Sequence, residues 1–114
     1  TDWRIPSGFD QALTEIIHAI SDLTDPPRPI RRPQPLYPPE LKRAGIEGTV
    51  LVMFVVRSNG TVSNIEIQSA SHPGFAESAV KSIRKWQFEP GRKDGHAVHT
   101  RVRQSIPFRI NPGI

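Results

Sequence analysis

Apolar and polar residues alternate near the end of the chain, over His99 to Ile110. Apolar side chains occupy even positions and polar ones odd positions, as seen at Val102, Ile106, Phe108 and Ile110 against Arg101, Arg103, Ser105 and Arg109. This period of two predicts a β-strand with one buried face. Pro107 has no backbone N–H, so we expect an edge strand in which Pro107 faces the open side or lies in a bulge.

The direction of Pro107 would decide the direction of its neighbours. Hydrogen-bonding direction alternates along a strand, so an outward Pro107 places the amides of Arg101, Arg103 and Ser105 on the open side as well. Such a row of free amides is a template for an added strand. Prolines and charges on edge strands also commonly serve only to prevent aggregation, and the pattern leaves both interpretations open.

Two further β-rich runs flank Asn59-Gly60, a dipeptide typical of hairpin turns. A two-residue turn would place Ser58 opposite Thr61 and Val52 opposite Ile67. In that register Leu51, Met53 and Val55 share the second face of the sheet, which is half apolar and needs a cover. An N-terminal helix, predicted below, is one expected cover, and a dimer partner is the other.

A helix is predicted to open at Pro73, after the hairpin. Phe75, Ala79, Ile83 and Trp86 recur at helical spacing and form one apolar stripe. His72 stands where a cap for this helix is expected. The predicted order of strand, strand, helix, strand indicates an α+β fold: a small antiparallel-type three-stranded sheet with one face covered by a helix.

The N-terminal segment SGFDQALTEIIHAISDL, residues 7–23, has apolar residues at steps of three and four, with Ser7 and Asp10 placed as in a capping box. It predicts an extra amphipathic helix. A proline-rich basic spacer follows at 26–39 and is expected to be extended, and Pro39–Gly45 then predict a short helical turn. We therefore divide the chain into an acidic helix at 1–25, the spacer at 26–39 and a folded body at 40–114.

Charge is divided between these parts. Residues 1–25 carry a net charge of −4, and since the whole chain carries +4, residues 26–114 carry +8. This difference suggests that the two parts attract each other or that the body binds an anionic partner. The basic residues could also suit a nucleic-acid partner. Base stacking requires exposed aromatic rings, however, and the rings here belong to predicted apolar stripes, so we do not expect nucleic-acid binding.

No catalytic motif is recognisable, and we expect neither an enzyme nor a cofactor. The sequence has no cysteine, which excludes disulfides and thiol nucleophiles. His96 and His99 are three apart and would point to opposite faces of a strand, so we expect no metal site. No apolar run is long enough to cross a bilayer, and a chain that begins with Thr1 is expected to be a piece of a longer protein.

Four motifs in one order and spacing give the chain a family resemblance from about Arg32 to Ile110. The motifs are QP-x-YP at 34–38, G-x-EG-x-V at 45–50, the NG turn followed by V-x-x-I-x-I at 59–67, and W-x-F-EPG at 86–91. Together they resemble the C-terminal domain of TonB-family energy transducers of Gram-negative bacteria.

The resemblance implies a periplasmic domain of a protein anchored in the inner membrane. It implies an inner-membrane motor, ExbB–ExbD, as a partner of the missing N-terminal part. It also implies that the domain binds the TonB box of outer-membrane transporters for siderophores, haem or vitamin B12, by adding it as a strand, and pulls on it. A self-associating or scaffold module of another envelope complex, including a weak homodimer, is the alternative function.

Carried over by motif, Gln34 and Pro35 match the element near the bound box, and Tyr37 and Pro38 match the element that packs beside it. The docking edge implied on the last strand consists of Val98, His99, Thr100, Arg101, Val102, Arg103, Gln104, Ser105 and Ile106. The acidic helix predicted at 1–25 departs from the family pattern. It suggests either a specialised paralogue serving one receptor or a related domain used in another envelope machine.

Overall fold

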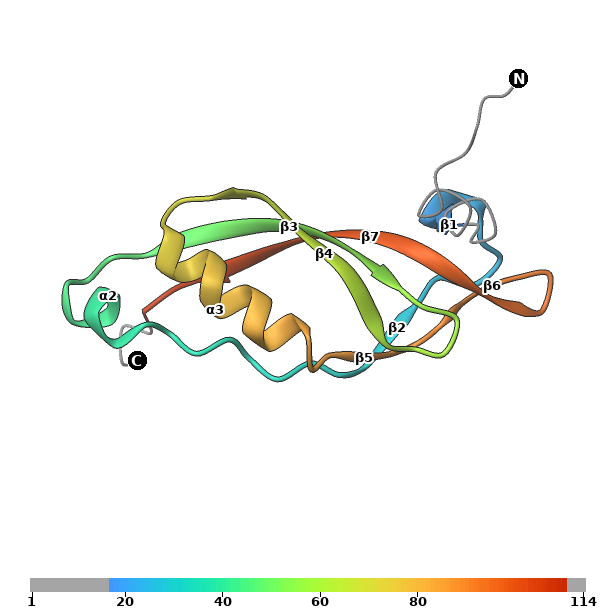
Figure 1. Cartoon of the computed structure of the whole chain (residues 1–114), viewed down its shortest axis with the longest axis horizontal. Coiled ribbons are helices and arrows are strands. Elements are labelled where there is room, and N and C mark those ends of the chain that lie inside the picture. Colours follow the sequence, from blue (N-terminus) through green and yellow to red (C-terminus); the bar gives the residue numbers. More distant parts are fainter. Residues whose placement is uncertain (1–16, 111–114) are drawn as a thin grey trace, which may run out of the picture.

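The computed structural model describes residues 17–110, and its centre is a sheet of three long strands. They are β3 (Gly48–Val56), β4 (Val62–Ala70) and β7 (His96–Phe108). β3 lies in the middle and pairs antiparallel with both neighbours. Helix α3 (Pro73–Ile83) packs on one face of this sheet (Figure 1). The predicted α+β fold is confirmed.

The core lies between the sheet and α3. Val50, Val52, Phe54 and Val56 of β3 are fully buried on the helix side. The predicted apolar stripe meets them and is buried at Phe75, Ala79 and Ile83 of α3 and at Trp86, just beyond the end of the helix. At one end of the core the rings of Phe75 and Phe108 stack at 4.4 Å, which ties α3 to the end of β7.

Both helices begin as predicted. The His72 side chain caps α3, because its Nδ1 accepts a hydrogen bond of 2.9 Å from the backbone N–H of Gly74. The short helix α2 (Pro39–Arg43) buries Leu41 and is followed by Gly45 with a φ of 71°. Among the described residues no helix combines the length and the hydrophobicity that a membrane crossing requires.

The hairpin between β3 and β4 has a three-residue loop, so the predicted two-residue turn is wrong. Arg57 N–H donates to Thr61 O at 2.7 Å, and Gly60 N–H donates to Arg57 O at 2.8 Å. Gly60 has a φ of 90°, the conformation that such a loop requires at its last position. An irregularity between Met53 and Val55 shifts the register by one residue, so Val52 still pairs with Ile67 as predicted, and a second one between Leu51 and Val52 shifts it again.

Four short strands accompany the predicted sheet, and two of them extend it. β6 (Gly91–Lys93) pairs with the start of β7, and β1 (Ile17–Ala19) runs parallel to β7. β2 (Arg28–Arg31) and β5 (Gln87–Glu89) form a separate antiparallel pair. These strands are too short to leave a periodic pattern in the sequence.

The predicted N-terminal helix is wrong over the part that the structure describes. Residues 17–19 form strand β1 and Ile20–Asp22 form the 3-10 turn η1. The rest of the predicted helix, residues 7–16, lies outside the described residues. A strand forms because the edge of β7 offers backbone partners, and isoleucine suits a strand at least as well as a helix.

The described residues cover the second face of the sheet only in part. Ile17 lines a small hollow on this face together with Met53 and Val55. Val55 is buried, whereas Leu51 and Met53 remain half-buried. Among the described residues, the N-terminal segment therefore contributes to the cover as a strand and not as a helix.

Candidate partner-binding edge

β7 has a paired side and a partly open side. On one side Thr100–Phe108 pair with β3 in an unbroken register. The start of β7 pairs with β6, where Val98 lies opposite Gly91. On the side of β7 away from β3, β1 pairs with His99–Arg101. From Val102 to Phe108, no strand within residues 17–110 pairs with the side of β7 away from β3. We call this stretch the open edge.

The hydrogen bonds of Thr49 establish which backbone groups face the open edge. Thr49 N–H donates to Ser71 Oγ and Thr49 O accepts from Ser71 N–H, at 3.0 and 3.1 Å. Both groups therefore point toward β4, so Thr49 forms no ladder bond with its partner Pro107. Pro107 consequently turns its nitrogen away from β3, toward the open side.

Because the register of β7 has no bulge, the same direction recurs at every second residue. The N–H and C=O groups of Arg103 and Ser105 face the open edge, and those of Arg101 face β1. The missing N–H of Pro107 is thus a donor that the β3–β7 ladder does not need. The predicted row of outward amides is supported by this geometry.

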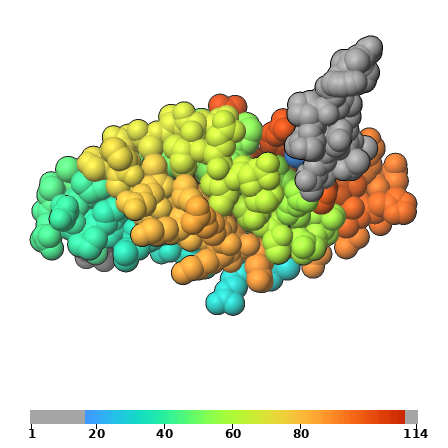
Figure 2. Space-filling view, in the orientation of Figure 1, coloured from blue at the N-terminus to red at the C-terminus, as the bar shows by residue number. Residues whose placement is uncertain are grey.

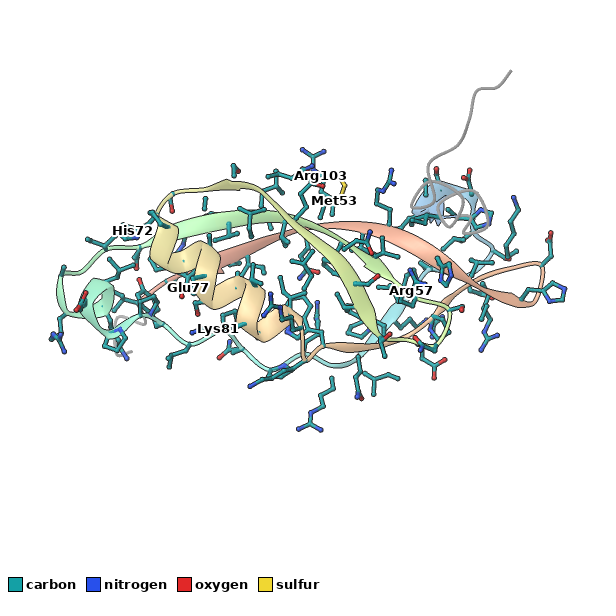
Figure 3. All side chains as sticks on the ribbon, viewed as in Figure 1. Met53, Arg57, His72, Glu77, Lys81 and Arg103 are labelled. Carbon is teal, nitrogen blue, oxygen red and sulfur yellow. The ribbon has the colours of Figure 1, made fainter. Side chains whose placement is uncertain are left out.

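The side chains of β7 alternate as predicted. Ile106 and Phe108 are buried against the core, and Val102 and Gln104 are half-buried on the same side. Arg101, Arg103, Ser105 and Pro107 are exposed on the face away from α3. Figure 3 shows Arg103 beside Met53 on that face, in agreement with their pairing across β3 and β7. The open edge therefore has an apolar side and a basic side.

Tyr37 packs against the end of β7. Its ring lies edge-on to Phe75 and Phe108, with centroid distances of 5.6 and 5.7 Å, and its hydroxyl donates to Ile46 O. Partial desolvation raises the pKa of the Tyr37 hydroxyl; the negative charge of Glu47 raises it further, and Arg109 acts in the opposite direction. The proton on Tyr37 is thereby retained where it is needed to donate the hydrogen bond.

The residues before Tyr37 follow α3. Pro33 O accepts hydrogen bonds from Trp86 Nε1 at 3.0 Å and from Ser82 Oγ, and Leu36 O accepts one from Ser78 Oγ. Ser78 and Ser82 lie one turn apart on α3, and Trp86 follows four residues later, just beyond the end of the helix, so the three donors form one row. This row fixes an extended segment whose prolines cannot form a ladder. The sequence signal was the spacing of the two serines and the tryptophan, which the prediction of a spacer did not use.

A groove of about 710 Å³ lies between this segment and the two helices. Gln34 and Pro38 line it, facing residues of α3 such as Lys81. Figure 2 shows the orange end of α3 above the cyan atoms of the proline-rich segment. Of the four motif residues, Tyr37 therefore contacts β7, and Gln34 and Pro38 face the groove. Pro35 is half-buried.

The histidines of this region have structural surroundings. His99 Nδ1 accepts a hydrogen bond of 3.0 Å from the backbone N–H of Ser58, which ties β7 to the hairpin loop. His96 is exposed at the start of β7. In the described part of the chain, no group of three His, Cys, Asp or Glu residues is placed to bind a metal ion.

Comparison with known proteins gives a consistent result. Over 86 residues the chain is 41% identical to protein TonB of Klebsiella pneumoniae, and over 93 residues it is 36% identical to protein TonB of Escherichia coli strain K12. These alignments cover 75% and 81% of this chain, but 33% and 37% of those proteins. The chain thus spans about a third of the length of these curated relatives.

The fold is also similar to a solved structure. The solution NMR structure of the Pseudomonas aeruginosa TonB CTD superposes with a TM-score of 0.69 at 27% identity, and the match covers 86% of this chain and 98% of that one. Residues 33–110 match the family described as Gram-negative bacterial TonB protein C-terminal. Because this match includes the core, α3 and β7, the chain belongs to the TonB C-terminal domain family.

Proposed function

We propose that this chain is the periplasmic receptor-binding domain of a TonB-type energy transducer. In this proposal it binds the TonB box of outer-membrane transporters by adding the box as a strand to β7. The observation that supports it most directly is the open edge, where the N–H and C=O groups of Arg103 and Ser105 face away from β3. Backbone groups in this arrangement are what an added strand requires.

Strand addition suits a transducer that serves several receptors. Each added backbone hydrogen bond contributes only about 0.5–1.5 kcal/mol net, and it does not depend on the side chain of the partner. A box needs an extended conformation more than a particular sequence. The exposed Arg101 and Arg103 would add an attraction for acidic residues near the box.

The position of β7 also suits a pulling role. β7 pairs with the central strand β3 along its whole length from Gly48 to Val56, and β3 is buried beneath α3. A force applied to a strand on β7 is therefore transmitted to the best-packed part of the domain. Whether the added hydrogen bonds break together or one by one depends on the direction of the pull.

The rest of the protein would supply the energy. By the family resemblance, a membrane anchor and the ExbB–ExbD motor act through the upstream part, and the pull opens transporters for siderophores, haem or vitamin B12. The domain itself is proposed to act as a transport transducer and not as an enzyme. The curated relatives are about three times as long as their aligned segments, which leaves room for such an upstream part.

Self-association is the second candidate function, because an open strand edge is also a site where another copy can pair. A second copy would use the same backbone groups of Arg103 and Ser105 and would leave none for a receptor. Sedimentation of the domain over a range of concentrations separates the two functions. A monomer at the concentrations used for peptide binding leaves the edge available to the box.

The experiment that tests the proposal is an amide-shift titration with a TonB-box peptide from a transporter of the same organism. We expect shifts from Val98 to Ile106, with further shifts at Tyr37 and Gln34. The same peptide with two adjacent prolines in its middle is the control, since one of the two then lacks an N–H toward β7 in either register. The absence of shifts at millimolar box peptide, together with a dimer in sedimentation, would reject the proposal and favour self-association.

A further inference from the structure

The edge of β7 is already occupied at one end by a segment of the same chain. β1 pairs in parallel with β7, so that Ile17 lies opposite His99, His18 opposite Thr100 and Ala19 opposite Arg101. These partners belong to the docking edge that the family resemblance implies. Figure 1 shows β1 on the side of β7 away from β3.

The pairing removes backbone groups from the docking row. Odd-numbered residues of β7 face away from β3, as the Thr49–Pro107 pair establishes, so His99 and Arg101 face β1. His18 lies between them in register, and in a parallel pair its N–H and C=O bond to these two neighbours. With β1 in place, the row that begins at His99 is free only from Arg103 onward.

The chain beyond β1 is firmly attached near the same site. Thr24 Oγ1 donates to Arg92 O at 3.0 Å and accepts from Asp94 N–H at 2.8 Å. Asp25 and Arg92 exchange two backbone hydrogen bonds, at 2.8 and 3.1 Å. Only η1 and Leu23 separate this anchor from β1. A strand on so short a tether returns to β7 at a high effective concentration.

β1 itself is weakly held. It has three residues, parallel pairs are less stable than antiparallel ones, and Ala19 and Ile20 are exposed. Ile17 is its contact with the sheet face and lines a hollow there without being fully buried. A longer strand that pairs from His99 to Ser105 would therefore form more backbone bonds than β1 does.

We propose that β1 competes with the receptor segment for the docking edge. The receptor segment must displace β1 to form its full set of backbone hydrogen bonds with β7. The inference rests on the proposed function and adds regulation to it. While β1 is paired with β7, His99 and Arg101 are covered and only Arg103 and Ser105 are open. This protects part of the edge from unwanted strand pairing. The receptor segment first pairs at Arg103 and Ser105 and then displaces β1 toward the anchor at Thr24.

A disulfide that locks β1 in place tests this directly, since the chain has no cysteine of its own. Ala19 and Arg101 are exposed register partners, and neighbouring strands lie about 4.8 Å apart, within the Cα range that a disulfide spans. We expect the oxidised form of the Ala19→Cys/Arg101→Cys variant to bind the box peptide about tenfold more weakly than the reduced form. The two forms differ only in the bond, so each is the control for the other.

A proline pair tests the opposite state. His18→Pro removes the N–H that faces β7 and should release β1, whereas Ala19→Pro changes an N–H that faces away, at a residue whose φ of −79° proline accepts. We expect His18→Pro to bind the peptide about tenfold more tightly than Ala19→Pro and to shift the amides of His99 and Arg101 before any peptide is added.

The outcomes are distinguishable from failure of the proposed function. Equal peptide affinity of the oxidised and reduced forms, or of the two proline variants, overturns the competitor role while strand addition stands. If no form binds the peptide, the proposed function fails and the competitor role fails with it. Tighter binding by His18→Pro together with weaker binding by the locked form supports both.

Discussion

At the scale of single residues, Gly60 meets two separate requirements of the fold. Its φ is 90°, and a Cβ at this position would lie 2.3 Å from Phe88 O. Phe88 lies this close because its N–H donates to Gly60 O at 2.9 Å, a hydrogen bond that joins the hairpin loop to β5. The NG turn predicted a glycine with positive φ, but not the close approach, since nothing in the hairpin sequence refers to a strand far along the chain.

Gly60→Ala and Gly45→Ala separate these two requirements. Gly45 also has a positive φ, 71°, but a Cβ there meets nothing within 4 Å. We expect Gly45→Ala to lower the free energy of unfolding by about 1 kcal/mol, the strain alone. Gly60→Ala should lower it by about 3 kcal/mol, because backbone must also move. Urea unfolding measures both, and equal losses would show that the contact with Phe88 does not constrain the loop.

Tyr37 offers a second test at this scale, because it is the single tyrosine of the chain. Partial desolvation, and then Glu47, raise the pKa of its hydroxyl above the usual value of about 10. The native state thus holds this proton more tightly than the unfolded state. The resulting stability is complete below the unfolded pKa and is lost as the pH rises through the folded one.

Tyrosinate absorbance during an alkaline titration of the folded domain measures this pKa. We expect a midpoint above that of the unfolded chain in denaturant, and a lower midpoint in Glu47→Gln, which removes the nearby negative charge. Ser69→Ala, a change at an exposed position on β4, should leave the midpoint unaltered. A native midpoint equal to the unfolded one would contradict the described surroundings of Tyr37.

At the scale of elements, the sequence predicted long periodic segments well and short ones poorly. β3, β4, β7 and α3 carry their own repeating apolar pattern, so each could be identified from its own residues. β1 and β2 form because β7 and β5 offer them partners, and this depends on tertiary packing. The spacing of Ile16, Ile17, Ile20 and Leu23 fits a helix equally well, which is why the predicted helix is wrong at residues 17–22.

The proline-rich segment shows the same dependence on its surroundings. Ser82 is buried, and its hydroxyl donates to Pro33 O beside the Trp86 indole N–H. We expect Ser82→Ala to lower the free energy of unfolding by about 1 kcal/mol, since Trp86 still satisfies the carbonyl. Ser69→Ala is the control, and equal effects of the two substitutions would mean that the segment is held by packing alone.

At the scale of the whole molecule, the candidate site combines features that the local sequence predicts with features that depend on tertiary packing. The parity of β7 and the outward direction of Pro107 could be derived from the alternation and from one proline. The occupation of His99–Arg101 by β1 could not, because it joins two distant parts of the chain. The sheet therefore ends in an edge that is part covered and part open, and the open part is where the domain can be extended by another strand.

Substitution at Ser105 tests whether the sheet is extended there. The N–H of Ser105 faces the open edge, so Ser105→Pro removes a donor from that side and leaves the β3–β7 ladder intact, as Pro107 already does two residues later. Ser105→Ala keeps the N–H and changes only the side chain. We expect the alanine variant to bind a TonB-box peptide like the parent chain and the proline variant to bind about tenfold more weakly, with both unfolding at the same urea concentration. Calorimetric titration of the two variants measures the difference.

Equal binding by the Ser105→Pro and Ser105→Ala variants would place the partner strand elsewhere, for instance on the outer edge of β4. Amide shifts confined to Val62–Ala70 would then identify that edge.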